Sequence, residues 1–261
     1  MTTTPVRFLL TAFSALAFSA AFSATFSAAA QADEVQVAVA ANFAAPLKLL
    51  AADFQKATGH QVQITVESTG KLYAQISNGA PFDILLAADE ATPARLEKEQ
   101  QAVAGSRFTY ASGTLVLWSA SPTGVDSQGE VLKQGRFQHL AIAAPKLAPY
   151  GAAALETLTK LKLLDGVQAK LVQGESIGQT YSFIASGAAE LGFVALSQVM
   201  ENGKLTSGSA WIVPAALHAP IRQDAVLLMK GKDHPAAIAL LDYLRSAPAK
   251  SAIRSFGYTV P

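Results

Sequence analysis

Residues 34–68 read EVQVAVAANFAAPLKLLAADFQKATGHQVQITVES and predict a strand, a helix and a second strand in direct succession. Glu34–Ala40 and Gln61–Ser68 alternate between apolar and polar side chains, as half-buried strands do. Ala45–Thr58 repeats its apolar residues with helical spacing, and Gly59 is the residue type that commonly ends a helix. Such a unit places two parallel strands in one sheet, with the helix on its face.

The same alternation continues along the chain and predicts an α/β fold with mostly parallel sheets and helices on both faces. After the first unit, one helix is expected to open with Thr92 as its N-cap and Pro93 in its first turn. The further strands are expected at Asp83–Ala87, His139–Ala143, Ala169–Gln173 and Leu191–Leu196. The further helices are expected at Lys71–Asn78, Gly151–Leu161, Gly178–Ser186, Pro235–Ser246 and Ala249–Phe256.

Two long extended runs interrupt this rhythm, Thr109–Ala120 and Arg222–Met229. Two strand–helix sets joined by two such runs predict two lobes with two crossings between them. The expected boundaries are residues 33–113 and 226–261 for lobe 1 and residues 114–225 for lobe 2, with crossing strands near 112–119 and 222–229. Because ligands of open α/β sheets bind at the carboxyl ends of the strands, the site is expected between the lobes.

The N-terminal segment predicts export. Residues 1–32 contain one charge, Arg7, and an apolar and small-residue stretch runs from Phe8 to Ala30. The stretch ends in Ala30-Gln31-Ala32, an A-x-A cleavage pattern typical of a secretory signal peptide. A membrane anchor is the alternative, which is disfavoured because Ser and Ala weaken the hydrophobicity of the second half.

Composition excludes several function classes. Without Arg7, residues 33–261 carry 19 basic and 19 acidic side chains, and this balance argues against nucleic acid as a partner. The chain contains no cysteine, which excludes disulfides, thiolate metal sites, thiol nucleophiles and a lipid on an N-terminal cysteine. We therefore expect a monomer that is free in the periplasm rather than lipid-anchored.

The remaining chemistry-bearing residues indicate no metal site and no cofactor. The four histidines lack metal-ligand spacing; they are His60, His139, His218 and His234. Trp118 and Trp211 are expected to pack in the core or at a lobe edge, and an aromatic ligand cage is the alternative.

Four predicted strand-to-helix turns share one chemistry, because small or hydroxyl-bearing residues stand directly before each helix. They are Ala40-Ala41-Asn42-Phe43, Glu67-Ser68-Thr69-Gly70-Lys71, Ala148-Pro149-Tyr150-Gly151 and Gly174-Glu175-Ser176-Ile177-Gly178-Gln179. The first N–H groups of a helix have no intrahelical partner and carry a partial positive charge, so they bind anions without a formal cation. Two such turns in each lobe predict a site for a fully ionised tetrahedral oxyanion, which only accepts hydrogen bonds.

Ordinary helix capping is the alternative at three of these turns, whose common N-cap residues are Asn42, Thr69 and Ser176. Glu67 and Glu175 would repel an anion, so we expect both to point away from it. Lys71 is expected to be solvated rather than a ligand.

At these turns, and along essentially all of residues 33–261, the chain resembles the periplasmic molybdate-binding proteins of ABC transporters. The matching stretches are VAVAANFAAPLKLLAADFQKATGH, ESTGKLYAQISNGAPFDILLAADE, SRFTYASGTLVLWSA, IAAPKLAPYGAAALETL, ESIGQTYSFIASGAAELGFVAL and the ending FGYTVP. The resemblance implies a two-lobed, hinge-closing fold of the type II periplasmic-binding class. It also implies a non-enzymatic receptor for molybdate and tungstate that serves a membrane permease.

The resemblance also implies the residues that contact molybdate. Asn42 stands where the family places a serine or asparagine that contacts the anion through backbone and side chain. Thr69 matches a serine that contacts it through hydroxyl and N–H, and Ser68 precedes it in the same turn. Tyr150 and Ile177 match positions that donate backbone N–H groups from the second lobe.

Two positions depart from the family's pattern. Ala41, next to the Asn42 contact, replaces a threonine of some members and offers no side-chain donor. Ala195 stands where some members donate a tyrosine hydroxyl, which leaves Tyr150 as the candidate to supply one. These departures leave the preference between molybdate and tungstate open, as well as whether Tyr150 acts through its hydroxyl or its N–H.

Two rival functions remain. Gly174–Gly178 fits the G-x-S-x-G pattern of a serine esterase, with Ser176 as nucleophile and Asp224 and His234 in the required chain order, although no HGGG-type loop is present. A receptor for another oxyanion, such as sulfate, would share the fold, and fold alone does not determine the solute.

Overall fold

The computed structural model describes residues 1–3 and 32–261. The predicted signal peptide, with Arg7 and most of its cleavage pattern, lies outside the described residues. Within the described ranges, none of the helices combines the length and the apolar character that a membrane span requires.

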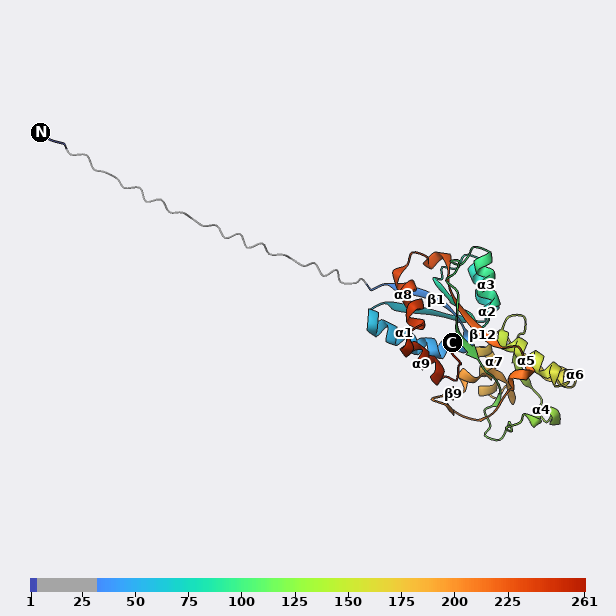
Figure 1. The fold of residues 1–261 in the computed structure, drawn as a ribbon. Coiled ribbons are helices and arrows are strands. Elements are labelled where there is room, and N and C mark those ends of the chain that lie inside the picture. The colour runs from blue at the N-terminus through green and yellow to red at the C-terminus, as the bar shows by residue number, and fades with distance from the viewer. Residues whose placement is uncertain (4–31) are drawn as a thin grey trace. The chain divides into compact units, whose positions relative to one another are not determined.

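The first sheet has five strands in the order β2-β1-β3-β12-β4. β1 pairs in parallel with β2 and β3, whereas β12 runs antiparallel to β3 and β4. Its strands are β1 (Glu34–Ala40), β2 (Gln61–Glu67), β3 (Ile84–Leu86), β4 (Phe108–Gly113) and β12 (Ile221–Leu227). The helices of this half, labelled in Figure 1, are α1 (Ala44–Thr58), α2 (Thr69–Ser77), α3 (Ala91–Lys98), α8 (Pro235–Leu244) and α9 (Ala247–Ser255).

The second sheet repeats this plan in the order β7-β6-β8-β5-β11. β6 pairs in parallel with β7 and β8, whereas β5 runs antiparallel to β8 and β11. Its strands are β5 (Leu115–Ser119), β6 (Leu140–Ala143), β7 (Leu171–Gly174), β8 (Leu191–Ala195) and β11 (Ser209–Ile212). The α-helices of this half are α4 (Glu130–Gln134), α5 (Pro149–Lys160), α6 (Leu164–Val167) and α7 (Ile177–Ala185).

The expected fold class is confirmed, since two α/β sheets of matching plan form two lobes. In each sheet the fourth strand, β12 or β5, is the one that arrives from the other lobe. The sheets divide the chain at 113/114 and at 220/221, because β12 pairs with the first sheet from Ile221 onward. The second division therefore falls five residues before the boundary expected at 225/226.

The run Thr109–Ala120, expected as one extended segment, consists of two strands in different sheets. The break falls at Gly113, where a Cβ atom would collide with the hydroxyl of Tyr150. A glycine is therefore needed where the chain leaves β4 for β5, because the Tyr150 ring lies against its backbone.

The prediction of Thr92 as a helix N-cap is wrong. α3 begins two residues earlier than predicted, at Ala91, and its N-cap position is Glu90 rather than Thr92. The capping carboxylate belongs to Asp89, whose oxygens accept hydrogen bonds from the N–H of Thr92 at 2.8 Å and from its hydroxyl at 3.2 Å.

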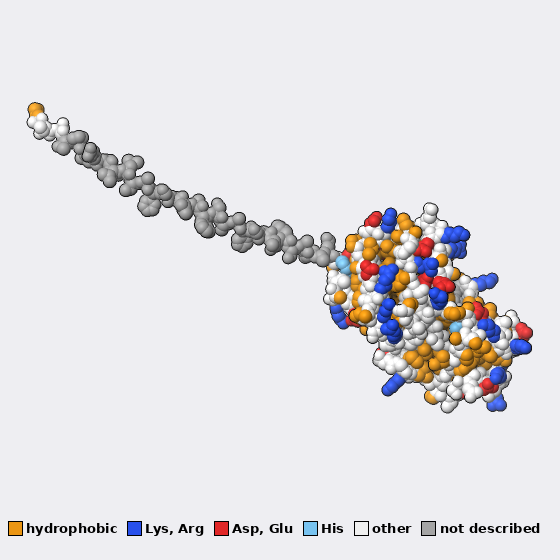
Figure 2. Space-filling view, viewed as in Figure 1, with side chains coloured by type: hydrophobic (Ala, Val, Ile, Leu, Met, Phe, Trp, Pro, Cys, Tyr) orange, Lys and Arg blue, Asp and Glu red, His pale blue; other side chains and the backbone are white. Residues whose placement is uncertain are grey.

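The central strands of each sheet are buried on both faces, which explains why they are apolar. Val35, Val37 and Val39 of β1 face the cluster built with α1, α8 and α9, whereas Ala38 faces the cluster under α2 and α3. In the second lobe, Trp118 is 1 % exposed, and its ring packs as core, as expected. Figure 2 shows basic and acidic side chains interspersed on the face in view, as the balanced charge of the sequence suggests.

Besides the short helices α4 and α6, three short strands were not predicted from the sequence. They are the hairpin β9 (Met200–Glu201) and β10 (Lys204–Leu205) and the edge strand β11. Five 3-10 segments complete the order: η1 (Ala41–Phe43), η2 (Gln168–Lys170), η3 (Leu196–Gln198), η4 (Ala215–Leu217) and η5 (Met229–Gly231). Of these, η1 and η3 contact each other across the lobes and help to position the site.

Candidate anion-binding site

The four strand-to-helix turns meet in one ring between the lobes. The second turn contacts the loop before the third, because the N–H of Gly70 donates to the carbonyl of Leu147 at 2.9 Å. The first and fourth turns are in close contact, since a Cβ added to Gly178 would lie 3.2 Å from Cβ of Ala41.

Side chains complete the ring. Lys71 of the second turn pairs with Glu175 of the fourth at 2.5 Å. Gln223 of β12 connects the first turn to the third, because its amide contacts both Asn42 and Tyr150. The structure therefore brings together all the sequence-predicted contact residues, which are Asn42, Thr69, Tyr150, Ile177, Ala41 and Ser68.

Most of these residues are buried. Asn42, Thr69, Tyr150 and Ile177 are between 1 % and 3 % exposed, and Ser68 is 3 % exposed. A cleft of about 330 Å³ opens beside them, between the second and third turns. Its walls include Gly70, Ala88, Leu147, Ala148 and Pro149. The ring is thus a closed polar interior with an open cleft next to it.

The helix N-termini of the ring mostly lack side-chain caps. Ser68 and Ala148 are the N-cap residues of α2 and α5, and neither side chain accepts a hydrogen bond from its own helix. The Thr69 hydroxyl instead accepts from the N–H of Ala88 at 3.0 Å. The N–H of Gly70 is already used, but other first-turn N–H groups, such as those of Thr69 and Tyr150, have no intrahelical partner and can donate to a ligand.

The capping alternative is correct at one turn only. The hydroxyl of Ser176 accepts a hydrogen bond from the N–H of Gln179 at 3.2 Å and caps α7. The side chain of Asn42 makes no such contact with the helix that follows it. Among the three residues proposed as caps, Ser176 alone uses its side chain in that way.

Buried atoms without partners are concentrated in the ring. In residues 32–261 three buried side-chain atoms lack a hydrogen-bond partner, and they are Asn42 Oδ1, Ser68 Oγ and Gln101 Oε1. Two of the three belong to the first two turns. A buried polar atom without a partner costs about 1–3 kcal/mol, so such atoms point to a missing ligand or water.

A buried polar cluster lies directly behind Asn42. The Nδ2 atom of Asn42 lies 2.8 Å from Oε1 of Gln223 and 2.9 Å from the hydroxyl of Tyr258. The backbone carbonyl of Asn42 accepts from the hydroxyl of Ser197 at 2.9 Å and lies at the same distance from the hydroxyl of Tyr258. Because Ser197 belongs to the second lobe, this cluster ties the lobes together at the first turn.

The phenols of this cluster stay neutral. Burial raises the pKa of Tyr110 and of Tyr150 well above the usual value of 10. Burial likewise raises the pKa of Tyr258 to about 12, although hydrogen bonds from its neighbours act in the opposite direction. The site therefore holds hydroxyl groups, not phenolates, at any physiological pH.

The charged residues of the turns lie at the edge of the ring. The side chains of Lys71 and Glu175 are 33 % and 66 % exposed, and Glu67 is 35 % exposed. Pairing with Glu175 is the main cause that raises the pKa of Lys71. Both carboxylates thus contact Lys71 near the surface, and Lys71, expected to be solvated, is ion-paired and only partly exposed.

The two departures from the family's pattern also have a structural setting. Ala195 ends β8 in the core, and its N–H donates to the side chain of Gln198 at 3.0 Å. Gln198 in turn donates to the carbonyl of Ile177 at 3.1 Å. This link braces the fourth turn through backbone groups, so its position does not depend on a side chain at residue 195.

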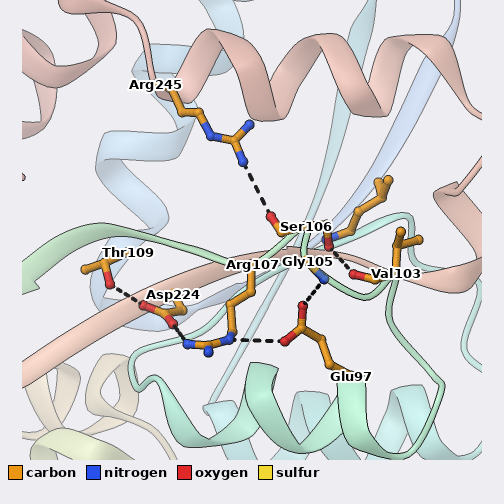
Figure 3. A network of polar contacts seen from close by, with 9 residues as sticks. Glu97, Val103, Gly105, Ser106, Arg107, Thr109, Asp224 and Arg245 are labelled. Atoms are coloured by element: carbon orange, nitrogen blue, oxygen red, sulfur yellow. Dashed lines mark hydrogen bonds and ion pairs between the residues drawn. The ribbon is translucent and has the colours of Figure 1, made fainter.

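The esterase constellation is not assembled. Ser176 caps its own helix, while the carboxylate of Asp224 is held by Arg107 at 2.6 Å (Figure 3). His234 contacts Asp33 at 2.8 Å. The three residues have separate partners, and the structure does not bring them together. Within residues 1–3 and 32–261, no group of three or more His, Asp or Glu side chains is placed to hold a metal ion.

Sequence reasoning missed the cluster behind Asn42. Gln223 is fully buried, and Tyr110, Ser197 and Tyr258 come from distant parts of the chain. The available signal was a polar residue in the strand IRQDAVL, at a place where every later side chain but Asp224 is apolar. No local pattern indicates which turn such a residue faces.

Comparison with known proteins agrees with this geometry. The profile described as "Bacterial extracellular solute-binding protein" matches residues 35–259. A relative named molybdate-binding protein ModA, from Azotobacter vinelandii, is 61 % identical over 230 residues, which is 88 % of this chain and 91 % of the relative. A protein of the same name from Rhodobacter capsulatus is 51 % identical over 229 residues, covering 88 % and 89 %.

A solved structure is similar as well. The Azotobacter vinelandii periplasmic molybdate-binding protein superimposes with a TM-score of 0.85 at 44 % identity. The match covers 87 % of this chain and 99 % of that one. The similarity therefore extends over both lobes and the ring of turns between them.

Proposed function

The chain belongs to the family of bacterial extracellular solute-binding proteins, and we propose that it is the molybdate receptor of a periplasmic ABC importer. Two relatives named molybdate-binding protein match this chain over about nine tenths of their own length, and a receptor of this kind is not an enzyme. The observation that carries the proposal is the ring of four turns, which gathers neutral donors from both lobes around buried polar atoms that lack partners.

The proposed contacts follow from the chemistry of each turn. Asn42, Ser68 and Thr69 would supply side-chain donors and N–H groups from lobe 1. Tyr150 and Ile177 would supply N–H groups from lobe 2. Each hydrogen bond to an ionised group contributes about 1.5–3 kcal/mol, so several together support tight binding after the cost of association.

Neutral donors favour a fully ionised tetrahedral anion. Such an anion accepts at every oxygen and needs no acceptor in the pocket, whereas a protonated phosphate needs one. Tungstate has the same charge and shape, so we propose that it binds as well. Both anions are ligands, and the proposal includes no cofactor.

The arrangement also suggests how binding is reported to a permease. Contacts to one anion from both lobes favour the state in which the lobes are together, by the difference in affinity between the two states. The Gly70–Leu147 hydrogen bond and the Lys71–Glu175 pair belong to that state. We propose a monomeric receptor, exported by a cleaved signal peptide and free in the periplasm, that delivers the anion to a membrane permease.

Calorimetry with molybdate, tungstate, sulfate and phosphate tests the proposal. Molybdate and tungstate are expected to bind with similar affinity, and sulfate and phosphate to bind far more weakly. Tight binding of sulfate with no heat from molybdate or tungstate would show that the protein binds a different oxyanion at the proposed site. No binding of any of the four would reject the site itself.

A further inference from the structure

Two buried side-chain amides, those of Asn42 and Gln223, lie against each other behind the site. The Asn42 atom that faces Gln223 is 2.8 Å away from it and also 2.9 Å from the hydroxyl of Tyr258, while the other amide atom of Asn42 has no partner. One amide atom of Gln223 lies 3.0 Å from the hydroxyl of Tyr110, and the other lies 3.1 Å from that of Tyr150. Nitrogen and oxygen of an amide have nearly the same shape, so the surrounding network decides which atom takes which place.

The hydroxyl of Tyr110 decides the orientation of Gln223. It lies 2.9 Å from the carbonyl oxygen of Ala87, which can only accept, so the single phenolic proton is used there. The oxygen of Tyr110 is then an acceptor, and the Gln223 atom 3.0 Å away satisfies it only as the NH₂ group. The carbonyl oxygen of the Gln223 amide consequently faces Tyr150 and accepts a hydrogen bond from its hydroxyl.

Asn42 must turn together with Gln223. Because the NH₂ group of Gln223 also faces Asn42, the Asn42 atom 2.8 Å away has to be the oxygen. The single proton of the Tyr258 hydroxyl then goes to this oxygen, 2.9 Å away, and the backbone carbonyl of Asn42 is satisfied by the hydroxyl of Ser197 at 2.9 Å. The NH₂ group of Asn42 then occupies the position that has no protein partner. In this joint orientation each amide atom of the cluster has a partner except the Asn42 NH₂ group, which remains free for a ligand.

We propose that Gln223 is the positioning residue of the anion site. Its amide holds the NH₂ group of Asn42 toward the anion and accepts a hydrogen bond from the hydroxyl of Tyr150. The inference rests on the proposed function and deepens it. Tyr150 then serves the anion through its backbone N–H alone. Gln223 also contributes to specificity, because with Asn42 turned the other way an acceptor would face the ligand, which disfavours a dianion and suits a protonated oxyanion.

The variant Gln223→Glu tests this role through its pH profile. An ionised carboxylate has no donor and draws the NH₂ group of Asn42 to itself, whereas a protonated carboxyl keeps one O–H donor, which serves the Asn42 oxygen although not Tyr110 as well. Molybdate affinity should be near that of the wild type at about pH 6 and fall about 10- to 100-fold toward about pH 10. The wild type and Gln55→Glu, which adds the same charge on the exposed face of α1, should show no such fall.

The groups that face residue 223 do not titrate in that range. They are the phenols of Tyr110 from β4, Tyr150 from α5 and Tyr258 from the C-terminal segment, whose pKa values are all raised by burial. The neighbouring carboxylate of Asp224 pairs with Arg107 at 2.6 Å. A pH-dependent loss confined to Gln223→Glu therefore reports the carboxyl group at residue 223.

An NMR measurement on the wild-type protein tests the same proposal without requiring that a variant folds. The chain contains three asparagines, which are Asn42, Asn78 and Asn202, so selective ¹⁵N labelling yields three side-chain NH₂ pairs. Saturation with molybdate should shift the Asn42 pair and slow its hydrogen exchange, and leave the pairs of Asn78 and Asn202, both exposed, unchanged.

The outcomes separate the two proposals. An unmoved Asn42 pair in molybdate-saturated protein, or a Gln223→Glu variant that follows the control at every pH, would overturn the positioning role alone. Absence of molybdate binding in the wild type would instead overturn the proposed function.

Discussion

The two lobes contribute to the ring in different ways. In lobe 1, Asn42, Ser68 and Thr69 carry polar side chains that do not cap their helices, and two of them hold a buried atom without a partner. In lobe 2, Ser176 caps its own helix and Ile177 is apolar. One half of the proposed site thus offers side-chain groups to the anion, and the other half offers backbone N–H groups. Substitutions in lobe 1 should therefore change affinity directly, whereas those in lobe 2 should do so only when they alter an N–H group.

The largest effect is expected from Asn42→Asp. The substitution replaces an NH₂ donor with a buried carboxylate that faces a dianion, and nothing nearby neutralises it. Molybdate affinity measured by calorimetry should fall about 1000-fold or more. Asn78→Asp makes the same chemical change at an exposed residue and should bind as the wild type does. Equal losses in both variants would mean that net charge, not the ring, is responsible.

A second effect concerns stability and is shared by the lobes. Burial raises the pKa of Tyr258 to about 12 from an ordinary value of 10.0, and it also raises that of Tyr150 in the other lobe. Above pH 10 the unfolded chain loses the phenolic proton while the folded chain keeps it, so the unfolded state binds fewer protons and stability falls as pH rises. Below pH 10 the contribution is fully present.

For Tyr258 the two-unit difference corresponds to about 3 kcal/mol of unfolding free energy, lost between pH 10 and about 12. Denaturant titrations across this window should show a smaller slope with pH in Tyr258→Phe than in the wild type. Identical slopes would mean that this phenol is not held neutral by the fold.

The backbone half is tested by Ile177→Pro. Ile177 is the first residue of α7, where proline fits, and Ser176 before it has the extended conformation that proline requires. The change removes one N–H donor together with part of a buried apolar side chain, and molybdate affinity should fall about 10- to 100-fold. Ile177→Val keeps the N–H and should bind normally. If proline and valine behave alike, lobe 2 does not bind through this group.

The sequence predicts the sheets and the four turns, but it does not predict the buried polar cluster behind Asn42. Strand alternation and helix spacing predicted both sheets, because the spacing of apolar residues along the chain depends only on which face of each element is buried. They also located the four turns, since small and hydroxyl residues precede each helix. They did not reveal Gln223 and Tyr258, because the contacts of these residues join positions up to 216 residues apart. The cap of α3 was misassigned for a related reason, since Asp89 and Thr92 both suit that place and only the backbone path separates them.

Thr69→Ala should have an effect similar to or smaller than that of the proline variant. It removes one hydroxyl, which also accepts a hydrogen bond from the N–H of Ala88, while the N–H of residue 69 remains. The expected loss of molybdate affinity is about 1–3 kcal/mol. Thr69→Ser keeps the hydroxyl and should restore most of it. Unchanged affinity in the alanine variant would exclude a side-chain contact from this residue.

The smallest effect is expected from Lys71→Met, which removes the cation nearest to the ring. Its partner Glu175 is 66 % exposed, and exposed ion pairs contribute little because solvent screens them. Molybdate affinity should change less than about threefold, and wild-type affinity should depend only weakly on salt up to about 0.5 M. A much larger loss in the variant, together with a steep salt dependence in the wild type, would place a formal charge in the site. Neutral donors in both lobes would then no longer account for binding, and the contrast between the lobes would be secondary to Lys71.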